Sequence, residues 1–162
     1  MKGRILTIAA LVTTVVAVTA AIATAAPSGK LDAQVIGNVA IDPNDPTVAY
    51  VTARYICEGG AGAHVWTSVK QAESGLPEQW LTEEGSGARA AEEGAWSHSH
   101  RASVTCDGQW HVDTFTVDQV EWGAGDLKQG QAWVQFCVIP PGAPPGPDAE
   151  VITWSSRFAA IQ

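Results

Sequence analysis

The sequence predicts an all-β domain, an antiparallel β-sandwich of about seven strands, preceded by a signal peptide. Three observations lead to this prediction. β-branched and aromatic residues gather in short runs, Gly, Pro, Asn and Asp separate the runs, and no run repeats its apolar residues with a helical period. The chain has 162 residues, of which 46% are hydrophobic and 16% are charged. This composition is typical of one folded domain rather than of a disordered chain.

The N-terminus has the pattern of a secretory signal. Lys2 and Arg4 precede a long uncharged stretch, and the small residues Ala23 and Ala25 fit the cleavage rule for signal peptides. The alternative is an uncleaved anchor, because the apolar run approaches the length that spans a bilayer. We expect cleavage, which leaves no stable membrane span and a secreted protein, in the medium or associated with the cell envelope. The predicted organisation is a signal peptide over 1–25 and a single sandwich domain over 26–162.

Seven runs in the mature chain carry the strand pattern. In the second run, Val51, Ala53, Tyr55 and Cys57 alternate with more polar residues, so one face is expected to point inward. The sixth run is apolar on both faces, which is typical of a central strand. The predicted strands cover 33–41, 48–58, 63–71, 97–106, 109–118, 130–139 and 150–160.

Two long segments lack this pattern. Residues 72–95 are rich in Glu and Gly, and they predict a long acidic loop that is mobile, with a functional loop as the alternative. Residues 140–149 are rich in Pro and predict an extended loop before the last strand.

The dipeptide Asp107-Gly108 predicts a tight hairpin between the fourth and fifth runs, because Asp-Gly fits a two-residue turn. A two-residue loop places His98 and His100 on the same face as Asp113. A loop that is one residue longer shifts the register and exchanges the buried side chains for the exposed ones.

Three cysteines, Cys57, Cys106 and Cys137, occur in a protein that we expect to be exported, so one disulfide and one free thiol are predicted. A bridge between the second and sixth strands, as in an immunoglobulin-type sandwich, joins Cys57 to Cys137. The alternative joins Cys57, at the end of its strand, to Cys106, beside the Asp-Gly dipeptide. The residues alone leave both pairings open.

Charge and motifs exclude several classes of function. The 9 basic residues are scattered and face 17 acidic ones, so no basic face is available to bind nucleic acid. The sequence has no serine-hydrolase elbow, phosphate-binding glycine loop, HExxH helix or calcium loop. We therefore predict a protein that is not an enzyme and that has no cofactor.

One pattern is compatible with a metal ion. His98-Ser99-His100 projects two imidazoles from one face of a strand, and Asp113 is a candidate third ligand in the register of the two-residue loop. The alternative interpretation is a pair of surface or half-buried histidines, and no metal site is predicted outright.

Tryptophan is abundant, with 7 residues in the chain. Those within predicted strands, which are expected to pack in the core or on a sheet face, are Trp66, Trp133 and Trp154. The others lie in or near loops, where a large amphipathic ring often marks a recognition surface, and the alternative is that they close the ends of the sandwich. The predicted binding surface consists of Trp80, Trp96, Trp110 and Trp122.

Three segments resemble a family of small secreted actinobacterial domains of unknown function. Residues 48–57 (VAYVTARYIC), 64–71 (HVWTSVKQ) and 104–108 (VTCDG) are similar to the Y-x-C strand, the V-x-V-Q-like strand and the C-D-G hairpin of that family. The resemblance implies an immunoglobulin-like β-sandwich and a disulfide between Cys57 and Cys106. It carries over no activity and no catalytic residue.

The leading functional hypothesis is a secreted, non-enzymatic module that binds an unknown protein or a component of the cell envelope. In this hypothesis the loop tryptophans and the acidic loop over 72–95 bind the partner. It rests on the export signal, the loop tryptophans and the absence of catalytic motifs from the sequence. One alternative is a small-ligand carrier that resembles the secreted antibiotic-binding apoproteins, which are also acidic immunoglobulin-like sandwiches. Another is a metal-binding protein that uses His98 and His100.

Overall fold

The computed structural model describes residues 31–143 and 150–162. The predicted signal peptide over 1–25 lies outside the described residues, as does most of the Pro-rich segment 140–149. The described chain is all-β apart from two short helices, which confirms the predicted class. It contains no helix that is long and apolar enough to cross a membrane.

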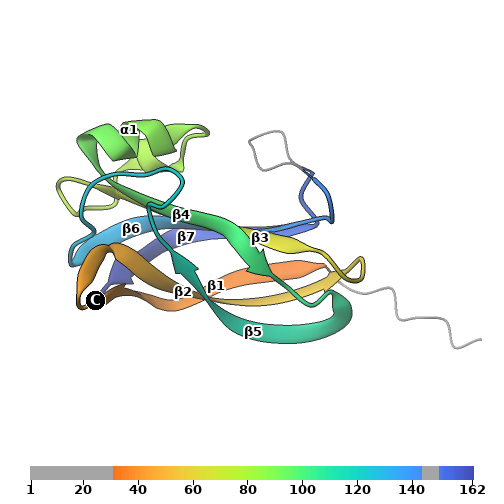
Figure 1. Ribbon diagram of the computed structural model, residues 1–162. Coiled ribbons are helices and arrows are strands. Elements are labelled where there is room, and N and C mark those ends of the chain that lie inside the picture. The colour runs from red at the N-terminus through yellow and green to blue at the C-terminus, as the bar shows by residue number, and fades with distance from the viewer. Residues whose placement is uncertain (1–30, 144–149) are drawn as a thin grey trace, which may run out of the picture.

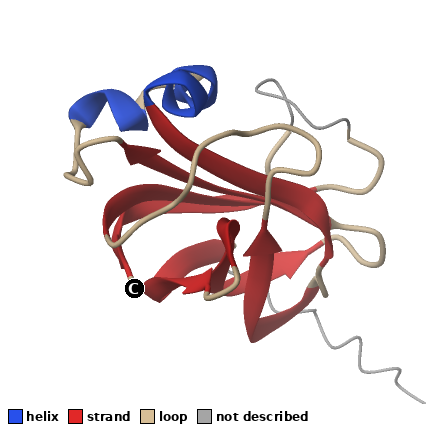
Figure 2. Ribbon diagram, turned by 60° about the vertical axis from the view of Figure 1, so that its left-hand side comes forward, coloured by secondary structure: helices blue, strands red, loops and turns tan. Residues whose placement is uncertain are grey.

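In the described residues, seven strands form a single curled sheet (Figures 1 and 2). Their boundaries agree with the predicted ones to within about three residues, and those of the sixth strand agree at both ends. The strands are β1 (Asp32–Asp42), β2 (Asp45–Glu58), β3 (His64–Ala72), β4 (Gly94–Ser103), β5 (Asp107–Val117), β6 (Gly130–Ile139) and β7 (Thr153–Ile161).

The sheet runs in the order β4-β3-β6-β7-β1-β2-β5 and curls into a half-barrel with two layers. One layer holds β1, β2 and β5, and the other holds β4, β3, β6 and β7, which is the strand arrangement of an immunoglobulin-like sandwich. Neighbouring strands are antiparallel except β1 and β7, which are parallel where Val39 pairs with Ile161. Because this contact joins the layers, the sheet is mixed rather than purely antiparallel.

Alternating residues of both layers fill the core between them. On β2, Val51, Tyr55 and Cys57 are buried, which confirms the predicted inward face. The ring of Tyr55 packs against Phe115 of β5 and Phe136 of β6, with ring centroids 6.3 and 5.8 Å away. Each such buried aromatic side chain contributes roughly 2–3 kcal/mol of transfer free energy. These three rings therefore hold the two layers against each other.

The predicted hairpin at Asp107-Gly108 is wrong. Both residues belong to the start of β5, which pairs with β2, whereas β4 pairs with β3 in the other layer. Gly108 has a φ of +76°, which favours glycine, and lies beside a register shift between β2 and β5. The positive φ of Gly108 therefore accommodates a register shift at the start of β5 and does not form a turn.

A disulfide joins Cys57, near the end of β2, to Cys106, just before β5, with 4.6 Å between their Cα atoms. This confirms the pairing that the family resemblance implies, and the alternative bridge from Cys57 to Cys137 is wrong. Cys137 lies on β6 with a free thiol. The bridge therefore ties two neighbouring strands of one layer rather than the two layers.

The predicted mobile loop over 72–95 is partly helical and packed. A 3-10 helix, η1 (Gln79–Thr82), and an α-helix, α1 (Ser86–Glu93), stand over the sheet near the start of β4 (Figure 1). Leu81 and Ala90 are fully buried against the sheet. The sequence conceals this helix because α1 has only eight residues and alanine is its only apolar residue type, so its hydrophobic period is too short to recognise.

Candidate functional site

Aromatic side chains are concentrated on the outer face of the β4-β3-β6-β7 layer. On β6, Val134 and Phe136 point to the core and are fully buried, so Trp133, Gln135 and Cys137 point outward. Strand pairing places the outward residues of the other strands beside them. This outer face comprises Trp96, His98 and His100 of β4, Trp66, Ser68 and Lys70 of β3, Trp133, Gln135 and Cys137 of β6, and Trp154, Ser156 and Phe158 of β7.

One end of the outer face is covered by η1 and α1, which we call the lid. Lys70 extends under the lid and donates a hydrogen bond of 2.6 Å to Ser86 Oγ, which in turn donates to the Leu81 carbonyl. Burial lowers the pKa of Lys70 to about 8. Trp133 and Phe158 pack edge to face at 5.0 Å and border the apolar cluster of the lid. This end of the face is therefore closed to ligands.

A stack of aromatic rings follows the edge of β4. The ring of Trp96 lies 4.8 Å from that of His98. Trp122, from the segment after β5, stacks on His98 at 5.6 Å. Backbone hydrogen bonds join that segment to β4 at two points, so it covers the strand edge. Trp122 is thereby fixed in place although it is 60% exposed.

The two imidazoles of His98-Ser99-His100 lie side by side, with ring centroids 6.2 Å apart. His98 is only 2% exposed, and neither of its ring nitrogens has a hydrogen-bond partner within the described residues. His100 Nε2 lies 3.0 Å from Glu121 Oε2. The other ring nitrogen of His100, Nδ1, is buried and has no hydrogen-bond partner among the described residues. Burial, followed by repulsion from His100, lowers the pKa of His98, so this ring is neutral at pH 7. A buried polar group without a partner costs about 1–3 kcal/mol, which a bound ligand or water can offset.

Asp113 does not join these histidines. It lies in the other layer, in register with core-facing Ala53, and accepts a hydrogen bond of 2.7 Å from the Tyr55 hydroxyl. Burial and this hydrogen bond raise the pKa of Tyr55. Among the described residues, no three His, Cys, Asp or Glu side chains form a group that could hold a metal ion. The expectation of Asp113 as a third ligand is wrong because it depended on a hairpin that β4 and β5 do not form.

No described element covers the other end of the outer face, which we call the open end. Here Trp66, Cys137 and Trp154 lie opposite one another on β3, β6 and β7. Trp154 lies on a sheet face, as expected, but it is 64% exposed rather than packed. Burial raises the pKa of Cys137 to about 11, so its thiol is protonated at neutral pH and is a poor nucleophile. The adjacent row across the same strands consists of Ser68, Gln135 and Ser156. Of these, Ser68 is fully buried and accepts a hydrogen bond of 3.0 Å from the Trp96 indole.

The four tryptophans of the predicted binding surface do not form one surface. Trp96 and Trp122 meet beside β4, as described above. Trp80 belongs to the lid, where the Arg89 guanidinium lies over its ring at 4.2 Å. Trp110 lies on β5, in the opposite layer, and is 44% exposed.

Trp66 and Trp154 are members of the open face that sequence reasoning missed. Both lie within strands, where the apolar pattern favours packing. Their common position opposite Cys137 comes from the register of three strands that are distant in sequence. Local periodicity does not give that register, so no local signal identifies the pair.

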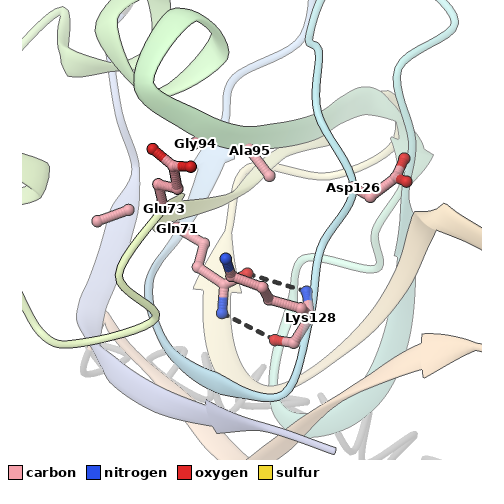
Figure 3. Close-up of a pocket in the computed structure, with 7 residues that line it drawn as sticks. Gln71, Glu73, Gly94, Ala95, Asp126 and Lys128 are labelled. Atoms are coloured by element: carbon pink, nitrogen blue, oxygen red, sulfur yellow. Dashed lines mark hydrogen bonds between the residues drawn. The ribbon is translucent and has the colours of Figure 1, made fainter.

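A small hollow near the end of β3 is bordered by hydrogen bonds between its own lining residues. Figure 3 shows the Gln71 amide donating to the Lys128 carbonyl at 2.8 Å and accepting from the Lys128 backbone N–H at 2.9 Å. These bonds attach the loop before β6 to β3, so the hollow has a structural role. Its lining consists of Gln71, Ala72, Glu73, Gly94, Ala95, Asp126 and Lys128.

Neither a scan against protein-family models nor a search of curated proteins found a match for the chain. The open end of the outer face offers indole rings, the hydroxyl of Ser156, the amide of Gln135 and a protonated thiol. These groups can bind a ligand by stacking and hydrogen bonding. They do not form the pair of an activated nucleophile and an adjacent base that covalent catalysis needs.

Proposed function

We propose that this chain is an extracellular, non-enzymatic binding module, and that the open end of the outer face binds a component of the cell envelope. The observation that carries the proposal is the presence of three indoles, Trp66, Trp122 and Trp154, on one face, with two of them more than half exposed. Tryptophan combines a large apolar ring with one hydrogen-bond donor, and it is enriched among the residues that dominate binding energies.

Two features support an extracellular location. The Cys57–Cys106 disulfide is of a kind that persists in oxidising compartments. The N-terminal pattern over 1–25 is that of an export signal. With that segment removed, the acidic domain would meet its ligand outside the cell.

The proposal is tested by fractionation of the cells that produce the protein. The variant Trp122→Ser with Trp154→Ser removes two exposed rings from the open face, while Trp110→Ser removes a comparably exposed ring from the opposite layer. We expect the double variant to move from the envelope fraction to the medium and Trp110→Ser to stay with the envelope. Equal retention of wild-type protein and both variants in the envelope fraction would contradict the proposal.

A second candidate function is metal binding by His98 and His100, because three of their four ring nitrogens are buried without a hydrogen-bond partner among the described residues. Imidazole is a good ligand for Zn²⁺, Cu²⁺ and Ni²⁺. Two imidazoles on one ion, with bonds of about 2.0–2.1 Å, have centroids roughly 5–6 Å apart, close to the separation observed here. A shared ion would still require the rings to turn toward each other.

Titration with Cu²⁺ tests this second function, because the adjacent Trp96 and Trp122 report the ion through quenched fluorescence. Saturable quenching that His100→Gln removes and His64→Gln retains would support it. Quenching that is the same in both variants would exclude the pair as a site.

A further inference from the structure

We infer that the ligand of the open face is a neutral glycan that lies across the strands. The inference rests on the proposed function and names the chemical class of its ligand. The surface that carries it, which we call the indole strip, consists of Trp66, Trp122, Gln135, Cys137, Trp154 and Ser156.

The indoles of the strip follow one another across the layer. Trp122 stacks on His98 of β4, whose partner on β3 is Ser68, beside Trp66. Trp154 lies on β7, two strands beyond β3. Because neighbouring strands are about 4.8 Å apart, the three strand spacings from β4 to β7 cover roughly 14 Å. A ligand that touches all three rings must therefore be extended and cross the strands, as a short run of linked sugar rings does.

The groups between the indoles suit a polyhydroxylated ligand. A sugar ring has an apolar C–H face, which packs on an indole, and a rim of hydroxyls, which both donate and accept hydrogen bonds. Gln135 and Ser156 make no side-chain hydrogen bonds within the part of the chain that the structure describes, and both are half-buried. An amide and a hydroxyl each donate and accept. A few such groups beside flat apolar surfaces are what fixes the orientation of a bound ligand.

Charge selects a neutral glycan over an anionic polymer. None of the residues of the strip is charged, and the nearest cation on β3, Lys70, is covered by the lid. The chain as a whole has a formal net charge of −8. An anionic polymer would be repelled by this charge and would find no counter-charge on the strip. A neutral glycan is not repelled by the negative charge and needs no counter-charge on the strip.

Two features of the face disfavour a protein ligand. The edge of β4 is already paired at Trp96 and His98 with Ala124 and Asp118, so an added strand from a partner would find this stretch occupied. A proline-rich peptide needs a groove between aromatic rings, but Cys137 stands between Trp66 and Trp154. The strip is a platform, which suits stacking of sugar rings.

The test uses cell-wall polysaccharide from the producing cells, digested with protease and separated into neutral and anionic fractions by ion exchange. The purified mature protein, Trp154→Ser and Trp110→Ser are applied to each immobilised fraction. We expect wild-type protein and Trp110→Ser to bind the neutral fraction, and Trp154→Ser to bind it about tenfold or more weakly. Unchanged thermal unfolding of Trp154→Ser shows that the loss is local. Binding should not change between low and high salt, because no ion pairs are involved.

Size-graded fragments of the neutral fraction sharpen the test. As competitors, they should gain potency with length until they span roughly 14 Å, the width of the strip, and little beyond. Gln135→Leu should weaken binding while retaining the volume of the side chain.

Binding to the anionic fraction alone, or equal binding by Trp154→Ser and Trp110→Ser, would overturn the inference. If protease treatment of whole envelopes abolishes a retention that depends on Trp154, the partner is a protein, and the proposed function stands while the glycan inference fails. If retention on untreated envelopes never depends on the strip, both fail.

Discussion

The outer faces of the two layers differ in how their polar side chains find partners. On the β1-β2-β5 layer, neighbouring side chains bind one another. The hydroxyls of Thr52 and Thr114 are 3.0 Å apart, and Arg54 donates to Gln34 at 3.2 Å. Arg54 also lies over the ring of Trp110 at 4.3 Å. These four polar side chains on this face are thus each other's partners.

The open end of the other outer face leaves its groups available. Gln135 and Ser156 bond to no other described side chain, and the rings of Trp122 and Trp154 are exposed. The contrast shows that an exposed tryptophan is a poor guide to a binding face by itself, since Trp110 is exposed too. What distinguishes the open face is that two polar side chains beside its rings, Gln135 and Ser156, have no hydrogen-bond partners within the described protein.

The largest effect is expected from the disulfide, which only the β1-β2-β5 layer has. Replacement of Cys57 and Cys106 by Ala should lower the free energy of unfolding by about 3–4 kcal/mol, because the bridge closes a loop of 49 positions. Urea unfolding without reductant measures the change. The control Cys137→Ser should change it by less than about 1 kcal/mol. Equal effects of the two changes would show that the bridge adds nothing.

The lid gives the second layer a pH dependence through a buried amine. In the folded protein the pKa of Lys70 is lowered from 10.5 to about 8. Between these two pH values the unfolded chain binds more protons than the folded one, so the free energy of unfolding rises with pH. From pH 8 to 10.5, wild-type protein should gain on the order of 2 kcal/mol relative to Lys70→Met, after allowance for solvent screening. The raised pKa of Cys137 makes stability fall with pH in the same range. Because Lys70→Met keeps Cys137, the difference between the two proteins does not contain this contribution. Parallel stability curves for the two proteins would contradict burial of the amine.

A smaller effect is expected where the lid meets the aromatic stack. A Cβ at Gly87 would lie 2.7 Å from the ring of Trp96. Gly87→Ala should therefore destabilise the protein by about 1–2 kcal/mol net, because overpacking outweighs the gain in helix propensity of about 1 kcal/mol. Urea unfolding checks this, with the exposed Ala88→Gly as a variant that changes propensity alone. A more stable Gly87→Ala protein would mean that the lid does not rest on Trp96.

The smallest expected effect is the coupling between neighbouring side chains on each outer face, which differs between the two layers. A double-mutant cycle with Thr52→Ala and Thr114→Ala should give a coupling of about 0.2–1 kcal/mol, because their hydroxyls form a cross-strand pair. The same cycle with Gln135→Ala and Ser156→Ala should give a coupling near zero. Similar couplings in both cycles would remove the distinction between the two faces.

Much of the fold follows from local sequence patterns. The alternation along 48–58 and the doubly apolar run 130–139 give two strands and their faces, because a strand's period is short enough to read. The sequence pattern does not predict the helix α1, because alanine and glycine provide its buried surface and its packing partners come from distant strands. Asp107-Gly108 misleads because positive φ at glycine suits both turns and bulges.

The candidate site depends more on long-range pairing than the fold does. His98 and His100 sit on one face, as the H-x-H spacing predicts, but their neighbour is Trp122 rather than Asp113. Trp154 becomes a surface ring only because β7 pairs with β6 in a register that turns it outward. These side chains become neighbours only through the pairing of strands that are distant in sequence, so no local sequence pattern predicts that they lie together.

The most direct test of the central claim is the affinity of wild-type protein, Trp154→Ser and Trp110→Ser for the neutral, protease-treated wall glycan, measured side by side. We expect wild-type protein and Trp110→Ser to bind alike and Trp154→Ser to bind about tenfold or more weakly. Equal affinities of the two variants would contradict it, because the two faces would then not differ in their capacity to bind.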